Sequence, residues 1–239
     1  MGILYLVSTP IGNLEDISLR AASILTSADL ILCEDTRRTG RLLEWLRDKS
    51  EFSNPGLEKP EMISYTDYTR ERRMDEILAR LAKGQKIALV SDSGTPLLSD
   101  PGYKLVQKVI ELSSDFDVTV ESIPGANAIL PALQLSGLPP DKFIFLGFLP
   151  RSSKHRKELF NGLKSFSLKI KTAICFESPF RLQDSLLDLK DVLGEVDVAI
   201  CRELTKMHEE ILRGTVSEAL AHFEEKGIKG EITLVFSLQ

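Results

Sequence analysis

Four loops of this chain carry residue types that suit the binding of a small polar molecule. Residues 91–102 read Ser-Asp-Ser-Gly-Thr-Pro-Leu-Leu-Ser-Asp-Pro-Gly and directly follow the apolar run 87–90. Gly94 allows a ligand to approach the backbone closely, and Pro96 fixes the direction in which the chain leaves. Three further loops rich in small or hydroxyl-bearing residues also follow apolar runs, at residues 8–13, 34–37 and 122–127. A lone loop of this kind is more often only a turn, but the recurrence favours a binding site built largely from main chain.

The elements that must position these loops alternate along the first half of the chain. Strand-like runs occur at residues 4–8, 30–33, 62–64, 87–91 and 118–123, and helical patterns at 19–26, 38–47, 72–83 and 103–112. This alternation is typical of an α/β sheet. Ligands of open α/β sheets bind at the carboxyl ends of the strands, so we expect the loops to converge.

The pattern restarts after residue 123. Strands are predicted at 143–147, 172–176, 197–201, 210–213 and 231–236, and helices at 127–135, 154–163, 179–189 and 217–226. The consecutive strands 197–201 and 210–213 indicate an antiparallel pair and therefore a mixed sheet. We predict an α/β protein with two domains, residues 1–120 with a mostly parallel sheet and 121–239 with a mixed sheet, packed around a shared cleft.

Helix-capping residues mark several boundaries. Ser18 is expected to cap a helix, Gly84 to end one, and Thr215 with Glu218 to form a capping box. Asp100-Pro101 and Ser178-Pro179 are each predicted to be an N-cap followed by the first helical residue. The polar segment 48–61 is predicted to be a mobile loop.

Composition excludes several classes of protein. The net charge of −5 over 239 residues argues against nonspecific coating of nucleic acid, which depends on neutralising phosphates. No apolar run approaches the ~20 residues that span a bilayer, and no signal peptide is visible, so we expect a soluble cytoplasmic protein. Three scattered cysteines, Cys33, Cys175 and Cys201, are expected to be buried thiols, and no metal site is predicted.

Common nucleotide and hydrolase motifs are missing from the sequence. It contains no GxxxxGK[ST], no GxGxxG after a strand and no GxSxG, which disfavours ATP, NAD and serine-hydrolase chemistry. His155, His208 and His222 lie in polar or helical contexts typical of surface histidines.

Six segments together resemble one family over essentially the whole chain. They are Ser8-Thr-Pro-Ile-Gly-Asn-Leu-Glu-Asp-Ile17, Glu34-Asp-Thr-Arg37, Ser91-Asp-Ser-Gly-Thr-Pro96 with Asp100-Pro-Gly102, Pro124-Gly125, Phe176-Glu-Ser-Pro179 with Arg181, and Arg202-Glu-Leu-Thr-Lys206. The chain is similar in these segments to the bacterial small-subunit (16S) rRNA 2′-O-ribose cytidine methyltransferases of the tetrapyrrole methylase superfamily. The resemblance implies a two-domain fold, a homodimer, and S-adenosylmethionine bound in the cleft between the domains.

The resemblance also implies where the cofactor binds. The positions carried over are Ile11, Asp92, Ser93, Gly94, Thr95, Pro124, Gly125, Asn127, Ala128, Leu204 and Ile232. Phe176, Glu177, Glu231 and Thr233 are further candidates.

Methylation of a ribose hydroxyl needs a group that removes its proton, because the hydroxyl is a poor nucleophile near neutral pH. The candidate catalytic residues are Glu34, Asp35, Glu177, Glu203 and Lys206. Glu34-Asp35 fits a helix N-cap equally well. The candidate RNA-binding residues, whose cationic side chains can hold phosphates, are Arg37, Arg38, Arg41, Arg151 and Lys154.

The sequence departs from the family pattern in three places, and two alternative functions also remain to be tested. Many members extend further at the C-terminus, so an accessory RNA-binding module is expected to be missing. Residues 65–73 replace a run that usually contains His and Asn, and Ser93 stands where alanine is common.

The alternative functions are methylation of a porphyrin or corrin ring, and nucleotide sensing by a nonenzymatic protein that kept only the fold.

Overall fold

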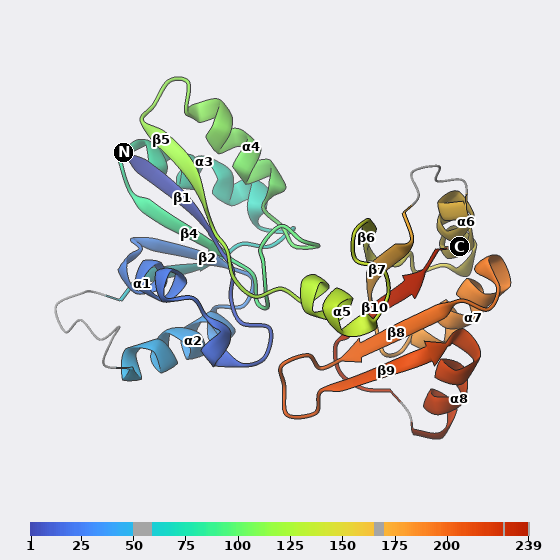
Figure 1. The fold of residues 1–239 in the computed structure, drawn as a ribbon. Coiled ribbons are helices and arrows are strands. Elements are labelled where there is room, and N and C mark those ends of the chain that lie inside the picture. The colour runs from blue at the N-terminus through green and yellow to red at the C-terminus, as the bar shows by residue number, and fades with distance from the viewer. Residues whose placement is uncertain (50–58, 165–169, 227, 239) are drawn as a thin grey trace. The chain divides into compact units, whose positions relative to one another are not determined.

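The computed structural model describes residues 1–49, 59–164, 170–226 and 228–238. The chain forms two compact units, Met1–Asn127 and Ala128–Gln239, each built on its own sheet (Figure 1). The predicted division lay at residue 120. Of the predicted mobile loop 48–61, residues 50–58 lie outside the described part of the chain.

The first unit contains a parallel five-stranded sheet, as predicted. Its strands are β1 (Gly2–Val7), β2 (Leu30–Cys33), β3 (Glu61–Ser64), β4 (Lys86–Val90) and β5 (Val118–Ile123), in the order β3-β2-β4-β1-β5. Val7 is in register with both Val90 and Ile123. The carboxyl ends of β1, β4 and β5 are therefore level, and the loops that follow them start at one edge of the sheet.

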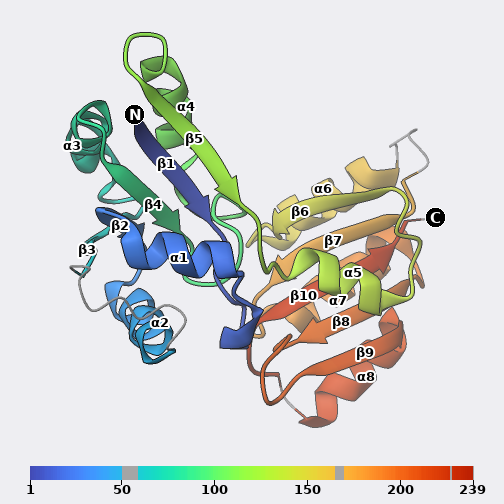
Figure 2. The same cartoon turned by 60° about the vertical axis from the view of Figure 1, so that its left-hand side comes forward.

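Helices cover both faces of this sheet because the strand residues alternate between two apolar clusters. The helices are α1 (Leu19–Ser27), α2 (Thr36–Asp48), α3 (Arg70–Ala82) and α4 (Tyr103–Leu112), with a short 3₁₀ turn at Leu14–Asp16. α1 and α2 pack on Ile31 and Val90, whereas α3 and α4 pack on Leu30 and Leu89. Figure 2 shows α1 and α3 on opposite sides of the sheet.

The second unit contains a mixed five-stranded sheet, also as predicted. The strands are β6 (Phe143–Phe148), β7 (Thr172–Glu177), β8 (Asp197–Arg202), β9 (Glu210–Thr215) and β10 (Ile232–Ser237), in the order β6-β7-β10-β8-β9. β6 pairs with β7 in parallel, and the other neighbours are antiparallel. β6 is therefore an edge strand.

Four helices pack on the second sheet. α6 (Ser153–Lys164), α7 (Leu182–Leu193) and α8 (Val216–Lys226) bury apolar side chains in one cluster with β7, β8 and β10. α5 (Ile129–Ser136) contacts β8 and β10 on the opposite face, as Figure 2 shows. The thiol of Cys201 donates to the backbone oxygen of Ala132 in α5, 3.9 Å away.

The structure confirms three of the predicted caps. Ser18 Oγ accepts the amide of Ala21 at 3.1 Å, and Gly84 has φ +87° directly after the C-cap of α3. Thr215 and Glu218 exchange the two bonds of a capping box, Thr215 N to Glu218 Oε2 at 2.8 Å and Glu218 N to Thr215 Oγ1 at 3.3 Å. The three cysteines are free and buried, as expected.

Two predicted helix starts are wrong. The N-cap of α4 is Gly102 instead of Asp100. The chain turns through φ +137° at Gly102, directly before the helix, and a proline, whose ring holds φ at about −65°, cannot adopt this conformation. α7 begins at Leu182 instead of Pro179. Residues 178–181 form a turn in which the amide of Arg181 bonds to the oxygen of Ser178, and this turn directs the Arg181 side chain toward Glu177.

Within the described ranges, no helix has the length and apolarity needed to cross a membrane. The same part of the chain contains no cluster of three or more His, Cys, Asp or Glu side chains placed to hold a metal ion.

Candidate functional site

The loops after β1 and β4 are joined directly by backbone hydrogen bonds. The amide of Thr9 bonds to the oxygen of Gly94 at 2.9 Å, and the amide of Gly94 bonds to the oxygen of Thr9 at 3.1 Å. The hydroxyl of Thr9 donates to the oxygen of Ser91 at 3.0 Å. The β1 loop is thereby fixed to both ends of the Ser91–Gly94 turn.

Thr95 links these two loops to the loop after β5. Its Oγ1 lies 3.0 Å from Oγ of Ser8 and 3.2 Å from the backbone oxygen of Ala126. Since a hydroxyl carries one proton, Thr95 donates to Ala126 and accepts the proton of Ser8. The loops of unit 1 after β1, β4 and β5 therefore converge, as the sequence predicted.

Close packing of these loops requires two of the glycines. Gly94 has φ +89°, and a Cβ there would lie 3.2 Å from Cγ2 of Ile11. A Cβ at Gly125 would lie 3.0 Å from Cβ of Ser8. The absence of a side chain at these two positions therefore allows the loops after β1, β4 and β5 to pack against one another.

The second part of the β4 loop has a strained backbone. Leu97 and Ser99 adopt φ values of +74° and +73°, a region in which residues other than glycine cost of order 1–3 kcal/mol each. A Cβ on Gly102 would lie 2.6 Å from Cδ2 of Leu97, so this position also excludes a side chain. Strained segments of this kind cluster at binding sites.

Asp92 connects the β4 loop to the loop after β2. Its Oδ1 accepts the amide of Asp35 at 3.0 Å, and its Oδ2 lies 3.7 Å from Nε of Arg38. Asp35 in turn is the N-cap of α2, since its Oδ1 accepts the amide of Arg37 at 2.9 Å. Hydrogen bonds from Arg37 lower the pKa of Asp35 well below its usual range, so Asp35 is a weak base.

Glu34, in the same loop, has a pKa close to neutral pH. Burial raises the pKa of Glu34 to about 7, and the negative charges of Asp100, Asp92 and Asp67 add to the effect. A carboxyl group with this pKa can both accept and release a proton at pH 7. The sequence placed Glu34 beside Asp35 but carried no sign that their pKa values would move in opposite directions.

In the second unit, the Glu203–Lys206 turn between β8 and β9 is held by charged contacts. Oε1 of Glu203 accepts Nζ of Lys206 at 2.9 Å and the amide of Glu231 at 2.7 Å. Nζ of Lys206 also lies 3.1 Å from Oε2 of Glu231. Burial opposes the charged form of Lys206, but its bonds to Glu203 and Glu231 outweigh burial and raise its pKa. Lys206 therefore stays protonated and acts as a cation.

The same turn has two residues with positive φ, Glu203 at +52° and Thr205 at +65°. Leu204 between them is buried. A Cβ on Gly230 would lie 2.5 Å from Cγ of Glu203, so the glycine makes room for the Glu203 side chain. The cofactor candidate Ile232 begins the neighbouring strand β10, in register with Arg202.

The carboxylate of Glu177 makes hydrogen bonds and an ion pair with other residues of the second unit. Its buried carboxylate accepts the amide of Ser178 at 2.6 Å and the hydroxyl of Ser185 at 2.5 Å, and it pairs with the guanidinium of Arg181. Arg181 Nη1 also donates to the oxygen of Leu149 at 3.1 Å. These contacts make Glu177 an anchor for the loop that follows β6.

The candidate RNA-binding cations lie in two exposed groups. Arg37, Arg38 and Arg41 lie on the first turns of α2, where Arg37 and Arg38 are paired with Asp35 and Asp92. Arg151 lies in the loop before α6 and Lys154 in the first turn of α6, in the other unit, and both are exposed.

The structure thus groups the predicted cofactor positions by unit. Unit 1 brings together Ile11, Asp92, Ser93, Gly94, Thr95, Pro124, Gly125 and Asn127, and unit 2 carries Ala128, Leu204 and Ile232. Sequence reasoning quoted Ser8 and Ser91 as motif residues but missed their supporting contacts. Ser91 Oγ bonds to the oxygen and amide of Ser93 at 3.1 Å, a contact that only the folded turn creates.

Comparison with known proteins defines the class to which this fold and these loops belong. The profile of the Tetrapyrrole (Corrin/Porphyrin) Methylases matches residues 3–220, and the chain belongs to this family. A solved uroporphyrin-III C-methyltransferase from Thermus thermophilus, complexed with S-adenosyl homocysteine, has the same fold, with a TM-score of 0.62 at 17% identity over 98% of this chain and 97% of that chain.

Two curated relatives have the same name. Ribosomal RNA small subunit methyltransferase I of Thermotoga maritima is 46% identical over 237 residues, which cover 99% of both chains. The protein of that name from Synechocystis is 45% identical over 99% of this chain and 79% of its own length.

Proposed function

We propose that this protein is an S-adenosylmethionine-dependent methyltransferase that methylates the 2′-hydroxyl of a cytidine ribose in the RNA of the small ribosomal subunit. The observation that carries the proposal is the 46% identity with a small-subunit rRNA methyltransferase over 99% of both chains. The membership of the methylase family supports the reaction class. The cytidine and the 2′ position come from the resemblance of the six sequence segments.

The loops of unit 1 fit a nucleoside-containing cofactor. Gly94 and Gly125 let the loops pack closely, because a Cβ at either position would lie 3.2 Å from Ile11 or 3.0 Å from Ser8, and Thr95 fixes the loops relative to one another. We propose that these loops of unit 1 contact S-adenosylmethionine, and Leu204 and Ile232 stay candidates that rest on the family resemblance alone. A solved member of the fold carries the demethylated product of this cofactor.

Methyl transfer to a hydroxyl is an in-line displacement that gains from positioning and from exclusion of water. The bound cofactor supplies an electrophilic methyl group on a sulfonium. As the ribose oxygen forms its bond to that carbon, the carbon–sulfur bonding pair returns to sulfur, and the hydroxyl proton must leave. We propose Glu34 as the acceptor of this proton, because its pKa of about 7 suits a base at neutral pH.

The other candidates are less suited to act as the base. The carboxylates of Asp35, Glu177 and Glu203 are held by hydrogen bonds to other groups of their own units, and Lys206 is a cation. Lys206 remains a candidate for stabilising negative charge on the acceptor.

The test is labelled methyl transfer from S-adenosylmethionine to purified small ribosomal subunits, followed by nuclease mapping of the labelled nucleotide. A tetrapyrrole precursor is the competing acceptor in a parallel reaction. Resistance of the labelled linkage to alkaline hydrolysis identifies a 2′-O-methyl group. Transfer to the tetrapyrrole but not to the subunit would overturn the proposal, and calorimetry that detects no cofactor binding would overturn every methylase hypothesis.

Glu34→Gln is the variant that tests the base. We expect kcat to fall by about 10²- to 10⁴-fold with cofactor affinity retained. The double variant Arg37→Glu, Arg38→Glu tests the RNA contact, and we expect RNA methylation to be lost. The single variant Arg37→Glu, which leaves the contact between Arg38 and Asp92 in place, should lose RNA methylation while cofactor affinity is kept, and equal loss of both by Arg37→Glu would contradict that assignment. The homodimer and the cytoplasmic location stay predictions.

A further inference from the structure

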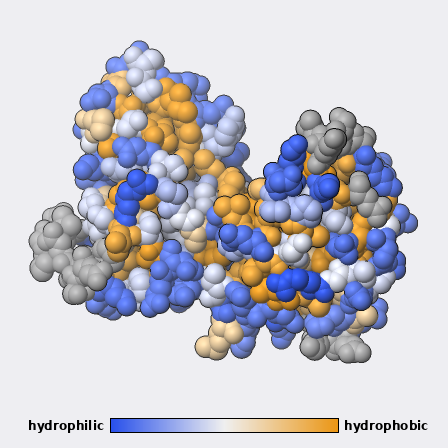
Figure 3. All heavy atoms as spheres, in the orientation of Figure 1, coloured by the Kyte–Doolittle hydropathy of each residue, from blue (hydrophilic) through white to orange (hydrophobic). Residues whose placement is uncertain are grey.

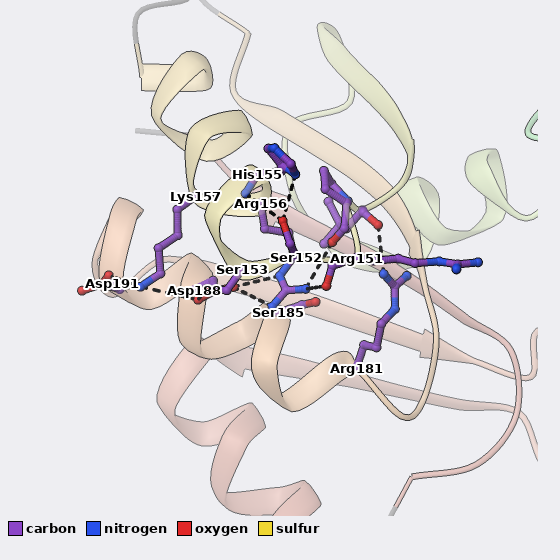
Figure 4. Close-up of polar contacts among 12 residues, drawn as sticks. Arg151, Ser152, Ser153, His155, Arg156, Lys157, Arg181, Ser185, Asp188 and Asp191 are labelled. Atoms are coloured by element: carbon purple, nitrogen blue, oxygen red, sulfur yellow. Dashed lines mark hydrogen bonds and ion pairs between the residues drawn. The ribbon is translucent and has the colours of Figure 1, made fainter.

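Two arginines, the buried Arg156 and the partly buried Arg181, hold the loop between β6 and α6 in unit 2. Nη1 of Arg156 donates to the backbone oxygens of Pro150 at 3.2 Å and Arg151 at 3.1 Å, while its Nε donates to Oδ2 of Asp188 at 2.9 Å. The side chains of Arg156 and Asp188 are 3% and 9% exposed. Figure 4 shows this network beneath the loop and the Arg151 side chain directed away from it.

Arg181 holds the preceding residue of the same loop. It bonds to the oxygen of Leu149 and pairs with Glu177. Three successive backbone oxygens, at residues 149–151, therefore accept bonds from arginines whose own carboxylate partners are buried. The loop is a fixed support, so ordering it on binding costs little conformational entropy.

This support carries two exposed aromatic rings. Phe148 directly precedes Leu149 and is 59% exposed, and Phe180 directly precedes Arg181 and is 92% exposed. The guanidinium of Arg181, the residue after Phe180, thus bonds to the backbone oxygen of Leu149, the residue after Phe148. Phe148 also contacts Phe176, with ring centroids 5.4 Å apart, and this contact supports one of its faces.

Two cations follow Phe148 closely in the chain, Arg151 in the loop after β6 and Lys154 in the first turn of α6. Arg151 and Lys154 are exposed, and neither makes an ion pair with any described residue. His155 is also exposed, and its ring accepts or donates a bond with Ser152 Oγ at 2.9 Å. Figure 3 shows that hydrophobic patches of this unit adjoin strongly hydrophilic side chains on the face drawn.

We propose that Phe148, Phe180, Arg151 and Lys154 form a platform for single-stranded RNA, on which unpaired bases stack on the two rings while phosphates contact the two cations. This inference rests on the proposed function for the identity of the substrate. Proteins read unpaired RNA by stacking bases on aromatic side chains beside a positively charged track. A dry protein interface fits less well, because it would bury two cations without partners.

The test measures binding of a fluorescently labelled, unstructured RNA oligonucleotide by fluorescence anisotropy. Phe180→Ala is expected to weaken binding by about 5- to 150-fold, the range for loss of one stacked base, and Phe180→Trp to retain it. Phe116→Ala is the matched control, because Phe116 is a 49% exposed phenylalanine of the other unit. Binding of a fully paired hairpin is expected to be unchanged by Phe180→Ala.

The salt dependence separates the roles of the rings and the cations. Arg151→Ala and Lys154→Ala are each expected to lower the slope of log Kd against log salt by about 0.7, the value for one phosphate contact on a single strand. Phe180→Ala should leave the slope unchanged. A fall in slope for Phe180→Ala as large as that for Arg151→Ala would overturn the stacking role.

Further measurements separate this proposal from the proposed function. Phe180→Ala should raise KM for the ribosomal subunit with kcat and cofactor affinity retained. Unchanged RNA binding by Phe180→Ala, in an enzyme that still methylates, would overturn the platform alone. A wild-type protein that binds RNA through Phe180 but transfers no methyl group would overturn the function alone. A change of oligomeric state in Phe180→Ala, measured by light scattering, would assign the surface to a second copy of the chain and overturn the platform.

Discussion

Replacement of Glu34 by glutamine should make the protein more stable, and by an amount that depends on pH. The folded protein raises the pKa of Glu34 from 4.5 to about 7 because of burial and the nearby Asp100, Asp92 and Asp67. Glutamine keeps the size and polarity of the side chain but never ionises. The variant therefore removes the cost of ionising Glu34 within its loop.

The sign and size of this stability change follow from the linkage between proton binding and folding. Between pH 4.5 and 7 the folded protein holds a proton on Glu34 that the unfolded chain releases, so this group lowers the free energy of unfolding as pH rises through that range. The difference between the two pKa values amounts to at most ~3.4 kcal/mol for a fully buried group. Because Glu34 is only partly buried, solvent screening reduces the expected effect to about 1–2 kcal/mol.

The assay is urea denaturation of wild type and Glu34→Gln at pH 5 and pH 8. We expect similar free energies of unfolding at pH 5 and a variant more stable by about 1–2 kcal/mol at pH 8. Glu44→Gln is the control, since Glu44 is exposed on α2. An advantage of Glu34→Gln that is the same at both pH values, or none at pH 8, would refute the raised pKa and with it the argument for Glu34 as the base.

Two further predictions concern the supports of the candidate site. Thr95→Val removes the hydroxyl bonds that join three loops. It should lower the free energy of unfolding by about 1–3 kcal/mol and weaken cofactor binding measured by calorimetry. Thr95→Ser should retain most of the stability and of the affinity, and equal behaviour of the two variants would contradict the role of the hydroxyl. Asp188→Ala removes the carboxylate partner of the buried Arg156 guanidinium and should lower the free energy of unfolding by about 3–5 kcal/mol. The double replacement Asp188→Leu, Arg156→Met should be much less damaging, and chemical denaturation that shows an additive loss would contradict the coupling.

The fold could be predicted because local rules and packing agree along most of the chain. Leu30–Cys33 and Val118–Ile123 were predicted to the residue, since the first is an apolar run between Asp29 and Glu34 and the second lies between Asp117 and Pro124. The parallel and mixed sheets followed from the spacing of strands and helices. Convergence of the loops in unit 1 followed from the rule that parallel strands end at one edge.

The errors arose where a contact far along the chain decides a local conformation. Ser178-Pro179 has the residue types of a helix start, but Arg181 must reach Glu177 and Leu149 O, and the turn that allows this delays α7 to Leu182. Likewise, the pKa of Glu34 depends on Asp67 and Asp100, which only the tertiary structure brings near it. Neither effect leaves a signal in the spacing of neighbouring residues.

The two groups of cations differ in how readily they can bind phosphate. Arg38 is paired with Asp92, which also fixes the amide of Asp35, so a substitution at Arg38 disturbs the loops proposed for the cofactor. Arg37 is 85% exposed, and an exposed ion pair of this kind contributes little to stability. A phosphate can therefore replace Asp35 as the partner of Arg37 at small cost. It follows that Arg37→Glu alone is a cleaner test of RNA contact on α2 than the double variant, because it leaves the Asp92 contacts in place.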